Sequence, residues 1–331
     1  MRGVASVVTG VACAIMLLTS PSESYAEDYL HLNKVIAKLE QGKLVTGIWC
    51  LSRSLSNARG IVDYNGYPTQ EEAMNKPMID CIVVAMEHYP YDITELRAFT
   101  LGLCSRREII TKGNIQPNCA LFVRLPVEGG DPVQPMIKQA LDVGAHGIVI
   151  PHVQNAGEAL KVVKACRYVR TKDSPYREPV GTRGYSPAIC SYLWGVAPAE
   201  YYERADVWPL NPRGDLMVVV MVEDPEGVRN IDEIVRVPGV GAVFFGPADY
   251  TVASGNYGDE GFDVNIALNR VKQACDDAGV PFVGFAGPDN IGELSKEKNR
   301  ILIIGSDIDK SGRADKVLGF LRSQSAPGRG E

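Results

Sequence analysis

The sequence has 331 residues, 45% of them hydrophobic, and its 34 basic and 40 acidic side chains give a net charge of -6 at pH 7. This composition excludes a disordered or fibrous chain and provides enough residues for one large domain or two small ones. Because no Lys/Arg block is long enough to follow a phosphate backbone, we do not expect nucleic acid as a partner.

The first 26 residues have the pattern of a secretory signal peptide. A single Arg precedes an apolar run at 4–18, and a polar stretch then ends at Ala26. A membrane anchor would need roughly 20 apolar residues, whereas this run is interrupted by polar ones. We therefore expect cleavage after Ala26, export to the periplasm or the exterior, and no membrane attachment of the mature protein.

Eight short apolar runs rich in β-branched residues recur from residue 44 onward. They are 44–52, 78–87, 118–126, 147–153, 216–223, 241–247, 281–287 and 301–307. Helical patterns occupy most of the gaps, at 93–103, 133–143, 155–169, 225–235 and 264–278. Eight such units predict an α/β fold, a single (β/α)8 TIM barrel over 27–325. The alternative is a doubly wound open sheet, but the Gly-rich turn typical of its first strand is missing from 51–60.

Two segments are longer than a minimal barrel requires. Residues 57–77 extend the loop after the first strand, and residues 171–215 follow the helix after the fourth strand and carry several Tyr and Trp. Long loops on the catalytic face often set substrate choice, but aromatic residues also gather at oligomer interfaces. The sequence leaves both interpretations open.

Polar side chains gather where the predicted strands end, which is where barrels of this kind place their chemistry. The ends carry Glu87, His88, Arg124, His152, Glu223, Asp249 and Asp307. Any single acidic residue among them could simply cap the next helix. Together, two His, one Arg and several carboxylates around one mouth indicate a site that binds something charged.

Glu223 and Asp249 end consecutive strands and have no Cys nearby. Two such carboxylates suit a hard divalent cation such as Mg²⁺ or Mn²⁺, which prefers oxygen ligands. Water and substrate can occupy the remaining coordination positions of the cation. The small residues Gly246, Pro247 and Ala248 precede Asp249, so backbone N–H groups there could approach a bound carboxylate.

Seven segments between residues 44 and 307 have the order and spacing of a known family. They are VVAMEHYPYD, LFVRLP, QALDVGAHGIVIPHVQNAGEA, GTRGYSP, VVVMVEDPEGVRNIDEI, GVGAVFFGPADY and IIGSD. Through them the sequence resembles the HpcH/HpaI group of class II, metal-dependent pyruvate aldolases, which includes 2-keto-3-deoxy sugar acid and 4-hydroxy-2-oxoheptanedioate aldolases. The resemblance implies a barrel of the phosphoenolpyruvate/pyruvate superfamily.

The resemblance also implies a reaction and a set of roles. A 4-hydroxy-2-oxo acid would be cleaved to pyruvate and an aldehyde through an enolate stabilised by Mg²⁺, Mn²⁺ or Co²⁺. Glu223 and Asp249 would hold the cation, Arg124 would face the enolate, and His88 would transfer protons. Asp142 matches the family residue that pairs with this histidine.

The position of Asp142 predicts an oligomer. It precedes the fourth strand, so five or six residues at ~3.3 Å each, roughly 17 to 20 Å, separate it from the mouth. Asp142 therefore cannot touch His88 of its own barrel. Either it is only a helix-end residue, or it reaches the site of a neighbouring subunit. We favour a homo-oligomer in which Asp142 crosses the interface, because members of the family form closed homo-oligomers.

Two positions depart from the family pattern. The family usually has Asp where this chain has Ala85 and Gln where it has Met221, so the site is less polar than expected. His152 replaces an apolar residue of many relatives and is either a substrate contact or a packed core histidine. As alternatives we keep another carbon–carbon lyase or a decarboxylating enolate reaction on the same scaffold, and a non-catalytic exported binding protein.

Overall fold

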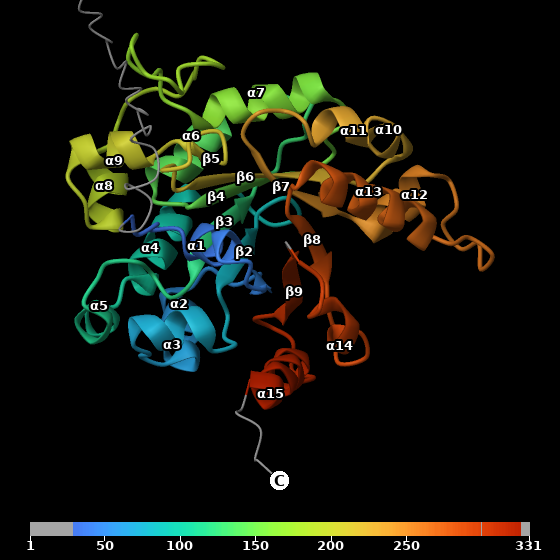
Figure 1. The fold of residues 1–331 in the computed structure, drawn as a ribbon, viewed down its shortest axis with the longest axis horizontal. Coiled ribbons are helices and arrows are strands. Elements are labelled where there is room, and N and C mark those ends of the chain that lie inside the picture. Colours follow the sequence, from blue (N-terminus) through green and yellow to red (C-terminus); the bar gives the residue numbers. More distant parts are fainter. Residues whose placement is uncertain (1–28, 299, 326–331) are drawn as a thin grey trace, which may run out of the picture. The chain divides into compact units, whose positions relative to one another are not determined.

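The computed structural model describes residues 29–298 and 300–325. From His31 onward, the described residues form one compact unit around a single sheet (Figure 1). The signal peptide predicted for residues 1–26 lies outside the described residues.

The sheet of the described residues has nine strands, and each pairs with its neighbours in parallel. Their bounds are β1 Val45–Cys50, β2 Cys81–Ala85, β3 Ala120–Arg124, β4 Gly147–Ile150, β5 Val207–Trp208, β6 Leu216–Val222, β7 Val240–Phe245, β8 Phe282–Phe285 and β9 Arg300–Ser306. Because β4 also pairs with β6, all of them except β5 close into a ring. The predicted (β/α)8 TIM barrel is confirmed.

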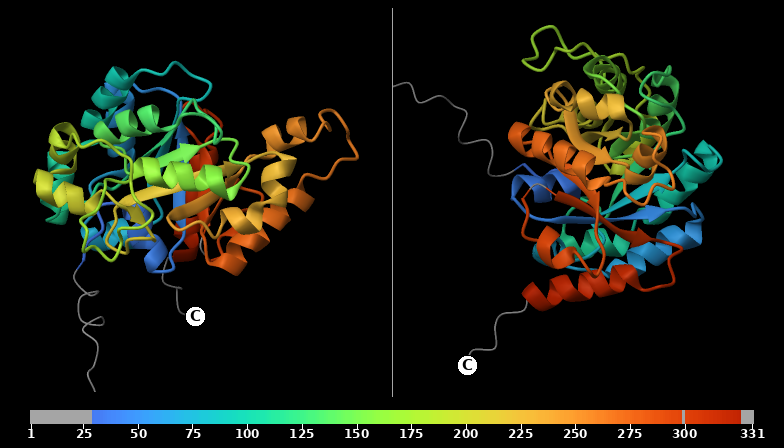
Figure 2. Two further views of the ribbon diagram at one scale, coloured as in Figure 1. Left: turned by 90° about the horizontal axis from the view of Figure 1, so that it is seen from above. Right: turned by 90° about the vertical axis from the view of Figure 1, so that its right-hand side faces the viewer.

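Helices cover the outside of the barrel, as two further views show (Figure 2). Their bounds are α1 Lys34–Glu40, α2 Leu55–Asn65, α3 Gln70–Asn75, α4 Ile93–Leu103, α5 Arg106–Lys112, α6 Gln134–Asp142, α7 Ala156–Cys166, α8 Ala188–Trp194, α9 Pro198–Arg204, α10 Pro225–Arg229, α11 Ile231–Ile234, α12 Pro247–Ala253, α13 Asn265–Ala278, α14 Ile291–Leu294 and α15 Arg313–Ser325. The helix predicted at 225–235 is interrupted at Asn230 and forms α10 and α11. Within the described ranges, none of the helices has the length and apolar character that crossing a membrane requires.

The segment 57–77, which we predicted to be a long loop, is mostly helical. The helix α2 buries Ala58, Ile61 and Val62, and α3 begins at a capping box. Gly60 lies inside α2, and a glycine in the middle of a periodic segment weakens the helical pattern of a sequence. The loop prediction was therefore wrong for this segment.

The second predicted long loop, 171–215, contains α8, α9 and β5. Its side chains form a layer packed against Tyr168, whose ring centre lies 4.4 Å from the guanidinium carbon of Arg183. Within the layer, Trp194 contacts Tyr201 edge-on, with ring centres 4.8 Å apart. The short strand β5 pairs with Leu216 and Met217 at the start of β6. From Val218 onward, β6 pairs with β7 instead. The layer is thus an extension of the barrel wall.

A short helix closes the barrel at the amino ends of its strands. The helix α1 contributes Val35, Ile36 and Leu39 to the same buried cluster as the inward side chains of the strands. Apolar contact with the barrel interior therefore holds α1 across this end like a plug. We call this end the base, and the opposite end, where the strands finish, the mouth.

Charged side chains fix the plug in place. Asp80 precedes β2, is fully buried, and lies 2.8 Å from the Nζ of Lys34 and 2.6 Å from the Nζ of Lys38, both in α1. A buried carboxylate is tolerated when opposite charges and hydrogen bonds compensate it. With the base closed in this way, the mouth is the open end at which small molecules can meet charged side chains.

Candidate active site

The mouth brings four ionisable side chains together. Glu87 follows β2, Arg124 ends β3, His152 follows β4 and Glu223 follows β6. The Nη1 of Arg124 lies 2.8 Å from the Oε2 of Glu87. The His152 ring lies between the two carboxylates, with Nε2 3.9 Å from Glu87 Oε1 and Nδ1 3.6 Å from Glu223 Oε1. Four strand ends therefore build one continuous charged cluster.

Glu223 is the most deeply buried member of the cluster, with 1% of its side chain exposed. Its Oε1 accepts the backbone N–H of His152 at 2.9 Å, whereas its buried Oε2 has no hydrogen-bond partner among the described residues. Burial raises the pKa of Glu223 to about 7, and the charges of Asp249 and Glu87 act in the same direction. Such an oxygen is costly to bury unless a cation or a donor meets it.

Gly246 provides the space for this unpartnered oxygen. The register of β6 and β7 pairs Val222 with Phe245, so Gly246 comes to lie beside Glu223. A Cβ atom at Gly246 would lie 2.2 Å from Glu223 Oε2, closer than real Cβ contacts come. The position of the Glu223 carboxylate therefore requires glycine at residue 246.

Asp249 completes a pair of carboxylates. It lies half-buried in the first turn of α12, close enough for its charge to raise the pKa of Glu223. The described residues contain no group of three or more His, Cys, Asp or Glu arranged to hold a metal ion. A divalent cation such as Mg²⁺ needs only one or two protein carboxylates when substrate and water supply its other ligands. Glu223 and Asp249 fit a cation held in this way.

Arg124 is held on two sides. Glu87 binds its Nη1, and its guanidinium carbon lies 4.5 Å from the ring centre of Trp49 in β1. Its Nε is buried and has no hydrogen-bond partner within the described part of the chain. A fixed guanidinium with an unused donor is suited to a negatively charged oxygen at the mouth.

The two histidines of the mouth differ in how freely their side chains can reorient. His88 is 61% exposed, and its Nε2 lies 3.5 Å from Glu87 Oε1. His152 has a φ of 50°, a left-handed conformation that is uncommon for a residue with a side chain. This conformation lets the His152 N–H bind Glu223 while the ring turns toward Glu87. His88 can therefore reorient toward a substrate, whereas His152 is fixed in the cluster.

The backbone before Asp249 offers fewer donors than we expected. The N–H of Gly246 already donates to the carbonyl of Val222 at 3.3 Å, and Pro247 has no N–H. Of the three predicted substrate-binding residues, Ala248 alone retains an N–H that could point to a substrate carboxylate.

Asp142 lies apart from the cluster in a single chain. It is the last residue of α6, at the base, and its Oδ1 binds the Nη2 of Arg183 at 2.8 Å. Burial raises the pKa of Asp142, while the Arg183 guanidinium opposes that rise. Asp142 thus has a partner in its own chain, and a contact with His88 would have to come from another subunit.

Three further residues considered in the sequence analysis contribute to packing or to a turn rather than to the charged cluster. Ala85 and Met221 are both buried, and Met221 belongs to the barrel interior. Asp307 accepts the backbone N–H groups of Leu51 and Ser52, each at 2.9 Å. Asp307 therefore fixes the turn after β1 and is bound to that turn rather than to the charged cluster.

The sequence analysis missed two contributions to the site. It gave no role to Glu87, which contacts His88, Arg124 and His152, and it did not consider Trp49 under Arg124. The alternation of side chains along a strand could have indicated both residues. Trp49 is the last inward-facing residue of β1, and Glu87 continues the inward face of β2.

Comparison with known proteins bears on what this site does. The chain is 25% identical over 286 residues to the 2-dehydro-3,6-dideoxy-6-sulfogluconate aldolase of Pseudomonas putida, covering 85% of this chain and 94% of the relative. It is 29% identical over 256 residues to the hydroxypyruvate/pyruvate aldolase of Pseudomonas aeruginosa, covering 76% and 79%.

A solved structure and a family description agree with these relatives. The structure of an HpcH/HpaI aldolase/citrate lyase family protein from Burkholderia cenocepacia has the same fold, with a TM-score of 0.62 and 24% identity over 88% of this chain and 96% of that one. The sequence model of the family described as HpcH/HpaI aldolase/citrate lyase matches residues 71–312, well over half of the chain. The resemblance seen in the sequence is confirmed, and the chain belongs to the HpcH/HpaI aldolase/citrate lyase family.

Proposed function

We propose that this protein cleaves a 4-hydroxy-2-oxo acid to pyruvate and an aldehyde, with Mg²⁺, Mn²⁺ or Co²⁺ as its cofactor. Family membership and the aldolase relatives make the chain a lyase of the aldolase kind. The observation that carries the finer proposal is the buried Oε2 of Glu223, which lacks a partner among the described residues and occupies the space left by Gly246, with Asp249 nearby.

The reaction breaks the bond between C3 and C4 of the oxo acid. A cation held by Glu223 and Asp249 would supply a Lewis acid for the oxygens of the 2-oxo acid group. His88 takes the proton of the 4-hydroxyl group, and the electron pair of the broken bond passes to the 2-oxo oxygen. Arg124 faces that oxygen and stabilises the enolate charge as it develops. His88 then returns this proton to C3 of the enolate, which yields pyruvate.

The substrate contacts are part of the same proposal. The N–H of Ala248 lies in the first turn of α12, where a carboxylate is favoured by the positive end of the helix dipole. The side chain of His152 is 27% exposed and lies between Glu87 and Glu223, so one edge of its ring can meet an oxygen of the substrate.

A second candidate is another enolate reaction on the same scaffold, such as a citrate-lyase-type cleavage or a decarboxylation. The buried apolar side chains of Ala85 and Met221 favour it, because they stand where the resemblance led us to expect an acid and an amide. A site that lacks both groups could serve a substrate with different polar atoms.

Pyruvate alone tests the proposal, because no aldehyde needs to be known. In D₂O with Mg²⁺, Mn²⁺ or Co²⁺, the protein should exchange the methyl protons of pyruvate, since the last step run backwards forms the enolate. Proton NMR measures the exchange, and a chelator should stop it. Release of pyruvate from 4-hydroxy-2-oxo acids, detected with lactate dehydrogenase, then identifies the aldol substrate.

The outcomes separate the candidates. Exchange together with pyruvate release supports the aldolase. Exchange without release from any 4-hydroxy-2-oxo acid supports the second candidate. If none of the three cations brings about exchange, the aldolase proposal fails.

We also propose a homo-oligomer in which Asp142 of one subunit orients His88 of another. Asp142→Asn and His88→Ala proteins should each be inactive, and co-expression of the two should restore part of the pyruvate exchange activity. Recovery is expected because some interfaces in a mixed oligomer pair an intact Asp142 with an intact His88.

Two controls make this experiment decisive. Differently tagged subunits, purified in sequence, prove that the oligomers are mixed. Arg183→Lys keeps a positive charge beside Asp142 within the chain and should retain activity if Asp142 acts across the interface. An active monomer by light scattering, or inactive mixed oligomers, would leave Asp142 with its intramolecular role alone.

Export is the remaining proposal, and it rests on the pattern of residues 1–26. A mature protein beginning at Glu27, found by amino-terminal sequencing of the exported fraction, would support it. An intact Met1 on protein that stays in the cytoplasm would contradict it.

A further inference from the structure

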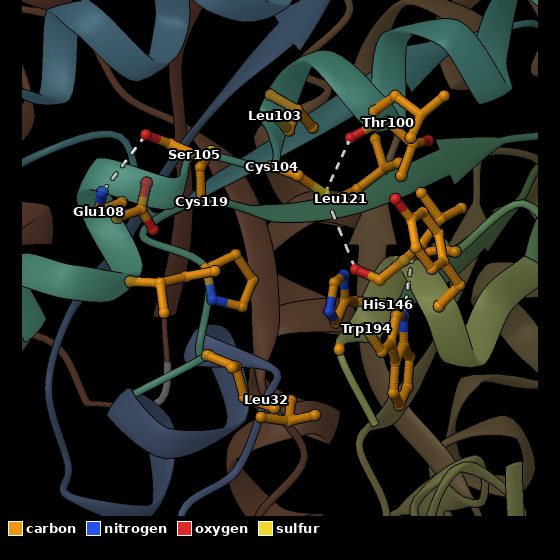
Figure 3. Close-up of a pocket in the computed structure, with 18 of the residues that line it drawn as sticks. Leu32, Thr100, Leu103, Cys104, Ser105, Glu108, Cys119, Leu121, His146 and Trp194 are labelled. Atoms are coloured by element: carbon orange, nitrogen blue, oxygen red, sulfur yellow. Dashed lines mark hydrogen bonds between the residues drawn. The ribbon is translucent and has the colours of Figure 1, made fainter. Parts of the chain in front are cut away.

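The described part of the chain has a cavity of about 370 Å³ that lies away from the mouth (Figure 3). It lies between the base of the sheet and the helices α4, α5 and α8. Leu121 in β3 lines it, and three strand residues, about 10 Å, separate Leu121 from Arg124 at the mouth. The cavity is therefore a separate feature from the charged cluster.

The walls of the cavity are mostly apolar. They include Leu32, Leu103, Ile115, Pro117, Leu121 and Trp194. An apolar cavity of about 150 Å³ is already large enough to bind benzene, so this one has room for a larger aromatic body. Water would find few polar partners here, since each buried water needs about three hydrogen bonds.

One polar side chain in the cavity wall lacks a partner. His146 is 7% exposed, and its Nδ1 is buried without a hydrogen-bond partner among the described residues. Its ring stacks on Trp194 with centroids 4.8 Å apart and planes 4° apart, which covers one face. Figure 3 shows the edge of this ring turned toward the open space between Cys119 and Leu32. The imidazole edge of His146 therefore faces the cavity, where a bound molecule can meet it.

The charge of His146 limits what that molecule can be. Burial lowers the pKa of His146 to about 4, so the imidazole is neutral at pH 7 and cannot compensate an anion. The other buried charge in the wall, Glu108, is already paired with Lys112 at 3.1 Å. Arg106 also lines the cavity but is exposed to solvent, so an ionised group at the inner end would lose its hydration without gaining a buried partner.

We propose that this cavity binds a small neutral aromatic molecule that carries one hydroxyl or N–H group. The aromatic body packs against the apolar walls, and the polar group forms a hydrogen bond with the imidazole of His146. This cavity is distinct from the catalytic mouth, so the proposal stands whether or not the aldolase reaction is correct.

Cys104 reports on occupancy, because it lines the cavity and is the exposed cysteine of the described residues. Phenol and toluene serve as probes of similar size that differ in one hydroxyl group. Both should slow alkylation of Cys104 by iodoacetamide at pH 8, followed by peptide mass spectrometry. The concentration that halves the rate of alkylation should be roughly fivefold lower for phenol than for toluene, which corresponds to about 1 kcal/mol for one hydrogen bond.

Two variants locate the effect. His146→Phe keeps a ring for stacking on Trp194 and removes both nitrogens, so the preference for phenol should disappear while toluene still protects. Leu103→Trp fills the cavity, so neither probe should protect Cys104. Circular dichroism checks the fold of each variant, and a misfolded Leu103→Trp protein would leave the His146→Phe comparison to decide.

The proposal fails if neither probe protects Cys104 of the unmodified sequence up to its solubility limit. It also fails if folded His146→Phe keeps the preference for phenol, or if folded Leu103→Trp is still protected.

Discussion

Replacing Glu223 by Gln or Asp249 by Asn should lower turnover roughly a thousandfold, because the Lewis acid that these carboxylates hold contributes several kcal/mol to the reaction. The fold should persist, since each substitution removes a charge and changes the side-chain volume little. The rise in melting temperature on adding Mg²⁺ or Mn²⁺ should also disappear. Pyruvate exchange and thermal unfolding, each with and without the cation, measure both effects.

Glu223→Gln has a second expected signature in the metal-free protein. The pKa of Glu223 in the folded protein, about 7, lies above its usual range, so folding disfavours the ionised form. A carboxyl group of this kind lowers stability at pH values above its unfolded pKa. At pH 8 the neutral Gln should therefore raise the melting temperature of the metal-free protein, whereas at pH 4 the two proteins should melt alike.

Glu226→Gln is the matched control, because Glu226 is an exposed carboxylate three residues along the chain. It should change neither turnover nor the response to the cation. Full activity in both Glu223→Gln and Asp249→Asn would contradict the cation site and with it the class of mechanism.

Arg124→Lys should lower turnover at least about 100-fold, the cost of losing a positioned donor to a developing oxyanion. An ammonium cannot reproduce the planar fork that lies over Trp49 and binds Glu87 with one nitrogen while others remain for substrate. Pyruvate binding should weaken much less than turnover falls, because the enolate charge is absent from the ground state. Steady-state kinetics and pyruvate titration by calorimetry give the two numbers.

Arg97→Lys, at an exposed position of α4, controls for the general effect of exchanging Arg for Lys. Equal losses in turnover and in pyruvate affinity for Arg124→Lys would indicate uniform binding rather than stabilisation of the transition state.

The barrel could be predicted because its strands are buried on both faces. All residues of β6 are buried, for example, and its sequence LMVVVMV is apolar throughout. The plug could not be predicted in the same way. Lys34 and Lys38 have the character of solvent-exposed residues, and only the fold brings Asp80 to them. Local sequence thus indicates a strand, whereas the burial of a charge depends on distant partners.

The same distinction applies to the mouth. The sequence places Glu223 and Asp249 at the ends of neighbouring strands, so their proximity could be predicted. Because both are carboxylates, a cation could be predicted as well. Which side chains touch depends on packing across strands, as in the contact of Arg124 with Glu87 above Trp49. The partner of Asp142 in its own chain, Arg183, lies 41 residues away in the inserted layer and has no local signal.

The plug also determines how the molecule can be attached to something else. The helix α1 lies across the base, and near the other end of the described chain Arg322 of α15 donates to the carbonyl of Pro77, just before β2, at 3.2 Å. Both ends of the described chain therefore approach the base, on the far side of the barrel from Glu223. In a single subunit, a fusion partner, an affinity tag or a solid support joined at Tyr29 or Ser325 would leave the entrance for substrate facing the solution.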